Sequence, residues 1–68
     1  MERIEKLKKV EEAFERRDVF RIDFSCDGML VAFYYKEEGT GNQDCISLSM
    51  IDAMNVLQGR RVVTTVLV

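Results

Sequence analysis

The apolar residues of this chain change their spacing at Asp18, and this change constrains the fold more than any other feature. Over residues 1–17 they recur every three or four positions, which predicts an amphipathic helix. Over residues 20–26 they alternate with polar residues, which predicts a half-buried strand. A helix that passes directly into a strand indicates an α+β domain.

An Asp-Gly dipeptide follows this strand and is a strong hairpin signal, because both positions of a two-residue hairpin turn need positive φ. We therefore expect Asp27 and Gly28 to connect two antiparallel strands with a fixed register. The expected core-facing pairs are Cys26 with Met29, Phe24 with Val31, Ile22 with Phe33, and Phe20 with Tyr35. The opposite face should bring together Arg21, Asp23, Ser25, Leu30, Ala32 and Tyr34. This face is neither cleanly polar nor cleanly apolar, as expected of a surface that meets a partner.

The rest of the chain predicts a loop, a third strand, a second helix and a last strand. These are a polar loop over 37–44, a strand over 45–48, a helix between an N-capping Ser49 and a terminating Gly59, and a strand over 60–68. We expect one domain over residues 1–68, with an antiparallel sheet of three to four strands. Its element order should be α-β-β-β-α-β, with an N-terminal helix and a second helix before the last strand.

Composition weakens several functional classes. The chain has no histidine and two cysteines, so it lacks the commonest general base and cannot build a Cys/His zinc site. We therefore expect no metal, no cofactor and no enzymatic activity. An enzyme would need a site formed across a dimer interface, with Cys45 or a carboxylate as the reacting group. Cys26 and Cys45 should be buried, inert thiols.

Charge and length set further expectations. With 10 Lys and Arg against 12 Asp and Glu, the net charge of −2 offers no bulk attraction to nucleic acid or anionic lipid. The apolar runs are too short to span a bilayer as a helix, and the charged N-terminal stretch does not resemble a signal peptide, so we expect a cytoplasmic protein. Because a chain of 68 residues is marginally stable alone, we also expect a homodimer.

These features favour a small module that binds another protein. Its expected partner-binding residues are Tyr34, Glu37, Glu38, Ile51, Asp52 and Met54. The alternative is a nucleic-acid-binding or nucleotide-binding regulatory protein that uses Arg21, Tyr34, Arg60 and Arg61. A steep loss of affinity with salt would support this alternative, because released counterions leave that signature.

A series of short motifs also resembles one known family. They are Asp18-Val19 at the start of a strand, the turn at Gly28, Tyr34 and Lys36 on the next strand, Ser47-Leu48-Ser49 before a helix, Gly59 after it, and a final aliphatic strand. In this order, over residues 18–68, the chain resembles the small phage-encoded uracil-DNA glycosylase inhibitors. The resemblance implies a homodimer that mimics the DNA backbone with carboxylates and takes an apolar side chain of the glycosylase into a pocket beside the helix. Asp52 matches an acidic position of the family, whereas Ile51 stands where the family has an aromatic residue.

Overall fold

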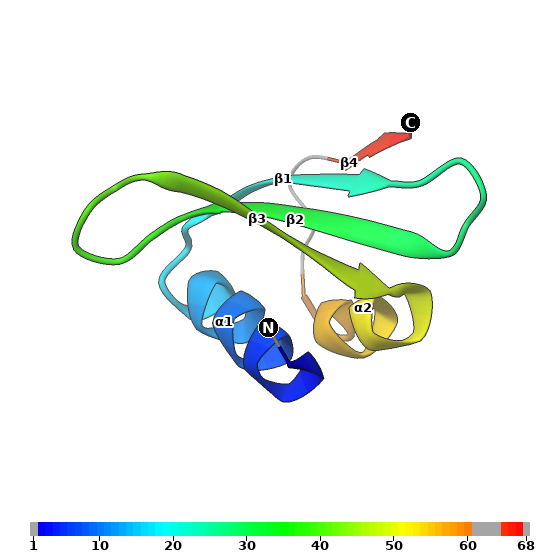
Figure 1. Ribbon diagram of the computed structural model, residues 1–68, viewed down its shortest axis with the longest axis horizontal. Helices are drawn as coiled ribbons and strands as arrows, with labels where there is room; N and C mark the ends of the chain where they lie inside the picture. Colours follow the sequence, from blue (N-terminus) through cyan, green and yellow to red (C-terminus); the bar gives the residue numbers. More distant parts are fainter. Residues whose placement is uncertain (1, 61–64, 68) are drawn as a thin grey trace.

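The computed structural model describes residues 2–60 and 65–67. In these residues, helices and strands follow the predicted order (Figure 1). They are α1 (Arg3–Glu15), β1 (Val19–Phe24), β2 (Leu30–Lys36), β3 (Gln43–Ser49), α2 (Met50–Leu57) and β4 (Thr65–Leu67). Both helices lie on the same side of the sheet, below it in Figure 1. The α+β class and the element order are confirmed.

The four strands form one sheet in the order β3-β2-β1-β4. The strands β1, β2 and β3 are antiparallel to their neighbours, as predicted. The last strand, β4, is parallel to β1, so the sheet is mixed rather than wholly antiparallel. The reason is the connection, because α2 carries the chain back along the sheet between β3 and β4, as parallel strands require. Of the predicted strand over 60–68, residues 61–64 and 68 lie outside the described part.

The hairpin between β1 and β2 has a wider loop than the Asp-Gly dipeptide predicts. Ser25 N donates to Leu30 O at 3.0 Å, which leaves four residues, 26–29, in the loop. Gly28 has a φ of +72°, but Asp27 does not have positive φ. Instead the Asp27 carboxylate accepts from Ser25 Oγ at 2.6 Å and from Met29 N at 3.0 Å. These side-chain hydrogen bonds favour the wider loop over the two-residue turn.

The register of this hairpin is as predicted up to a β-bulge. The pairs Phe24 with Val31 and Ile22 with Phe33 form as expected. The register then shifts by one residue between Val19 and Arg21, so that Tyr35 faces Val19. Phe20 is thereby turned out of the core and is 40% exposed, which corrects its predicted pairing with Tyr35.

The core fills the space between the two helices and the inner face of the sheet. Its buried members are Val10, Ala13, Ile22, Val31, Phe33, Tyr35, Ile46, Leu48, Ala53 and Val56. Phe33, in the middle of β2, is completely buried and packs edge-to-face on Phe14 with 5.9 Å between ring centroids. Because both helices contribute to this cluster, it fixes them to one face of the sheet.

The predicted limits of the second helix are confirmed. Ser49 Oγ accepts from Asp52 N at 3.3 Å, which satisfies one of the free amides in the first turn. At the other end Gly59 has a φ of +76°, a conformation that glycine adopts without strain. The hydrogen bond from Arg60 N to Leu57 O, 2.9 Å long, closes the turn.

Two expectations about sulfur-containing residues are wrong. Cys26 and Cys45 are free and exposed rather than buried. Cys26 and Met29 lie in the wide hairpin loop, and Met29 is exposed. Met54 is exposed on α2, whereas Met50 packs against the core.

The end of α1 carries a strained residue. Among the described residues, Arg17 is the one non-glycine residue with positive φ, at +62°. Arg17 N donates to Phe14 O at 3.0 Å and Asp18 N to Ala13 O at 2.8 Å. This pair of hydrogen bonds defines a Schellman motif, in which the left-handed position is usually glycine.

We therefore expect Arg17→Gly to stabilise the protein by about 0.5–1 kcal/mol, after the larger unfolded-state entropy of glycine is subtracted. Urea unfolding followed by circular dichroism measures this. Arg17→Ala is the control, because it removes the same side chain but keeps the strain. If Arg17→Ala stabilises as much as Arg17→Gly, the arginine side chain rather than the backbone is the cause.

Candidate functional site

The face of the sheet opposite the helices, hereafter the outer face, is the main candidate for binding. Neither helix covers it, since both pack on the inner face (Figure 1). Along β1 and β2, Arg21 pairs with Tyr34 and Asp23 with Ala32, as the hairpin register predicts. The ladder from β2 to β3 adds Cys45 beside Tyr34. The outer face is therefore a mixed polar and apolar surface of three antiparallel strands.

An ion pair lies within this open face. Arg21 Nε donates to Asp23 Oδ1 at 2.8 Å. Asp23 is only 8% exposed, although no described helix covers it, whereas half of the Arg21 side chain is exposed. The Arg21 guanidinium also lies 5.6 Å from the centroid of the Tyr34 ring, a cation–π distance. The outer face is thus ordered by its own contacts before any partner binds.

A shallow groove of about 260 Å³ runs along this face. Its lining residues are Asp23, Phe24, Ser25, Leu30, Ala32, Tyr34 and Ser47. Leu30 is 50% exposed at the hairpin end of the groove. The groove combines apolar walls with a carboxylate and hydroxyl groups, a composition that suits one side chain of a partner protein.

The phenol of Tyr34 stays a hydrogen-bond donor at neutral pH. The nearby Cys45, partial burial and Asp23 all raise the pKa of Tyr34 above its usual value, and Arg21 opposes them only in part. A neutral tyrosine with an exposed edge combines apolar area with a polar tip, which is common in binding surfaces.

The structure separates the predicted partner-binding residues rather than gathering them. Tyr34 is on the outer face, whereas Ile51 and Met54 are exposed on α2, on the helical side. Glu37 and Glu38 are in the loop between β2 and β3, which lies at the opposite end of the molecule from α2 in Figure 1. These residues therefore do not form one continuous surface.

Asp52 has a structural environment that the sequence did not reveal. Its carboxylate accepts two hydrogen bonds from Arg3, Nε to Oδ2 at 2.8 Å and Nη2 to Oδ1 at 2.7 Å. Asp52 is 5% exposed, and the hydrogen bond from Arg3 is the main cause that lowers its pKa. Both carboxylate oxygens of Asp52 thus hold α1 against α2, and little of this side chain is exposed for the predicted contact with a partner.

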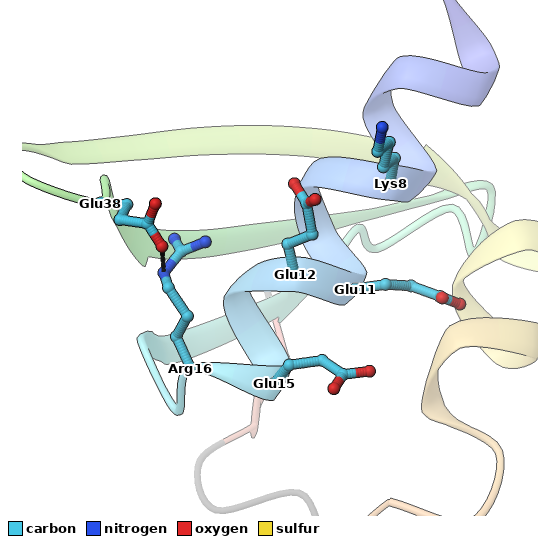
Figure 2. A pocket seen from close by; sticks show the side chains of 6 residues that line it. All are labelled: Lys8, Glu11, Glu12, Glu15, Arg16 and Glu38. Atoms are coloured by element: carbon cyan, nitrogen blue, oxygen red, sulfur yellow. Dashed lines mark ion pairs between the residues drawn. The ribbon is translucent and has the colours of Figure 1, made fainter.

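A second hollow, of about 380 Å³, lies between α1 and the β2–β3 loop (Figure 2). Its lining residues are Lys8, Glu11, Glu12, Glu15, Arg16 and Glu38. Figure 2 shows Arg16 and Glu38 pointing toward each other, with 3.8 Å between Arg16 Nε and Glu38 Oε2. Arg16 Nε also donates to Asp18 at 2.8 Å. We call this region the acidic surface, because four of its six side chains are glutamates.

The alternative nucleic-acid-binding residues are not assembled into one site. Arg21 and Tyr34 are neighbours on the outer face, but Asp23 neutralises Arg21. Arg60 lies 4.9 Å from the centroid of the Phe14 ring, and its Nε donates to Val56 O at 2.8 Å, so it belongs to the helical side. Arg61 lies outside the described residues.

Comparisons with family models, curated proteins and solved structures find no match for this chain. Within residues 2–60 and 65–67, neither helix has the length and apolar character needed to cross a bilayer. The same residues contain no group of three or more cysteines and carboxylates placed to hold a metal ion.

The ion pair between Arg3 and Asp52 predicts a pH-dependent stability. Because the folded-state pKa of Asp52 is below the unfolded value of about 3.9, its contribution is present at neutral pH and is lost as the pH falls through the folded value. Asp52→Asn should therefore unfold at lower urea concentration than the wild type at pH 7, and the difference should shrink below about pH 4.

A double variant controls for the role of the pair. Arg3→Gln leaves the Asp52 carboxylate buried without its partner, so adding Asp52→Asn to it should not destabilise the protein further. Additive losses in urea unfolding would show that the two side chains act independently and would contradict the pairing.

Proposed function

We propose that this protein is a non-catalytic binding module that occludes another protein with its outer face. The observation that carries the proposal is the uncovered groove, in which Leu30 and Tyr34 are accessible beside the ordered ion pair of Arg21 and Asp23. An apolar groove on a rigid strand surface gives a partner side chain a position to fill with little loss of conformational freedom. Polar groups around it supply specificity.

The groove favours a protein partner over a small-molecule substrate. Pockets for small molecules are concave and usually enclose about 300–1,000 Å³. The groove is smaller, at about 260 Å³, and is formed by the surface of one sheet. It therefore suits an apolar or aromatic side chain that projects from a larger protein surface.

A narrower form of the proposal concerns the kind of partner. The resemblance in motif order to phage inhibitors points to a uracil-DNA glycosylase, which such an inhibitor would meet in the cytoplasm of a bacterium. The acidic surface, which lies apart from the groove, supports this form because it gathers the carboxylates of Glu12, Glu15 and Glu38, and a DNA mimic needs several carboxylates in place of phosphates. We leave Asp52 out of the proposed contact, since Arg3 holds its carboxylate.

Aspartate substitutions test which face binds. Tyr34→Asp and Leu30→Asp place a charge in the groove and should weaken partner binding at least tenfold while the circular dichroism spectrum is unchanged. Ile51→Asp is the matched control, because Ile51 is 75% exposed on the helical side. If only Ile51→Asp loses binding, the binding site lies on α2 rather than on the outer face.

The first partner to test is a purified bacterial uracil-DNA glycosylase. Co-elution with this enzyme, together with inhibition of uracil excision, would support the narrower proposal. If the enzyme neither binds nor is inhibited, that form is wrong. Affinity capture from a bacterial lysate with wild-type, Tyr34→Asp and Ile51→Asp baits then tests the broader one, which requires a protein that the Tyr34→Asp bait fails to retain.

A further inference from the structure

The strand β3 is an open edge of the sheet. It lies at one end of the strand order, and among the described residues no strand pairs with its outer side. Its seven residues pair with β2 without a bulge. Natural edge strands usually carry lysine, proline or a bulge that prevents pairing with another chain, but β3 has none of these and one charged residue, Asp44.

The hydrogen bonds at the two ends of β3 show which backbone groups face the open edge. Glu37 N donates to Asn42 O at 2.7 Å, and Met50 N donates to Met29 O at 3.0 Å. Hydrogen-bonded pairs alternate along an antiparallel ladder. The even-numbered residues of β3 therefore bond to β2, and residues 43, 45 and 47 direct both their N–H and C=O groups outward. Ser49 offers only its N–H to this edge, because the carbonyl of an N-capping residue accepts the first hydrogen bond of the helix.

One of these outward groups has a partner within the chain. Cys45 N donates to the carboxylate of Asp44, its preceding residue, at 2.8 Å. This contact agrees with the outward direction of the Cys45 amide, because that amide does not reach β2. The Asp44 carboxylate thus caps one position of an edge that otherwise resembles the paired strands beside it.

The edge is complementary to a second copy of itself in antiparallel orientation. With a two-fold axis at Ile46, residue 45 faces residue 47 of the other copy, and residue 43 faces residue 49. Residues 45 and 47 then form complete hydrogen-bonded pairs, and Ser49 N–H can donate to the carbonyl of residue 43. An axis at residue 45 or 47 leaves one of the four residues without a strand partner. Asp44 faces a leucine of the other copy, so no like charges meet.

We propose that β3 pairs with β3 of a second copy about this axis, so that two chains form one continuous eight-stranded sheet. The pairing is isologous, since the same edge serves both copies, and it closes after two chains. Because strands paired within one sheet share its faces, the outer faces of both copies lie on the same side. The dimer forms without the partner of the proposed function, so its test is independent of that proposal.

Ser47→Pro tests the edge directly. Proline removes the outward N–H of residue 47 but no hydrogen bond to β2, so it should block dimerisation while leaving the fold intact. Analytical ultracentrifugation of the isolated protein should give a dimer for the wild type and for the control Ser47→Thr, and a monomer for Ser47→Pro. A wild type that is monomeric at every concentration, or a folded Ser47→Pro variant that is dimeric, would overturn the proposal.

Asp44→Ala gives a second test with the opposite sign. Removing the carboxylate frees Cys45 N for the other copy, so the dimer dissociation constant should fall several-fold. The Asp44→Ala variant tests the proposed pairing even if Ser47→Pro does not fold. An unchanged or higher dissociation constant for Asp44→Ala would then show that the seam lies elsewhere, for example at β4.

Discussion

The burial of Phe33 is the contact on which the rest of the structure depends. This side chain is in the central pair of strands and has no exposed surface, because Phe14 of α1 packs on its ring and the rest of the buried cluster surrounds it. A chain of 68 residues can build one such core but not two, since short chains bury only about 60% of their unfolded surface. Both helices are used on the inner face, and the outer face is left without cover.

The other specific interactions hold this one-sided arrangement in place. Arg3 and Asp52 join the N-terminal turns of α1 and α2, which are 49 positions apart in the chain. The bulge at Phe20 has a similar role at the other end, where Lys36 N donates to Asp18 O at 3.1 Å and ties the end of β2 to the start of β1. The two helices and the hairpin are therefore connected by directed contacts as well as by the core.

Local patterns predict much of this fold because they depend on neighbouring residues. The change of period at Asp18, the cap at Ser49 and the terminating Gly59 all act over a few positions, and the structure confirms them. The bulge, the parallel direction of β4 and the ion pair of Asp52 depend on tertiary contacts between distant segments. No local pattern shows such contacts. The sequence alone therefore predicts Asp52 at a partner-binding surface and Phe20 in the core.

The same limit applies to the candidate site. Alternation placed Tyr34 and Arg21 together on the outer face correctly, because strand periodicity fixes which side chains share a face. It could not show that Ile51 and Tyr34 lie on opposite sides of the molecule, since that depends on where α2 packs. The placement that the structure confirms, Tyr34 beside Arg21 on the outer face, is the one that strand register alone determines.

The area that a protein interface needs relates the uncovered outer face to the unpaired edge of β3. A stable protein interface buries about 800 Å² on each partner, and the whole chain exposes 4925 Å². Strands are about 4.8 Å apart and rise about 3.4 Å per residue, so three strands of at most seven residues present a flat area of roughly 340 Å². One outer face alone therefore falls short of a standard interface. In the proposed dimer, two outer faces joined at β3 would give about twice this area on one side of a continuous sheet, closer to the standard size. The proposed dimerisation would therefore favour the proposed partner binding.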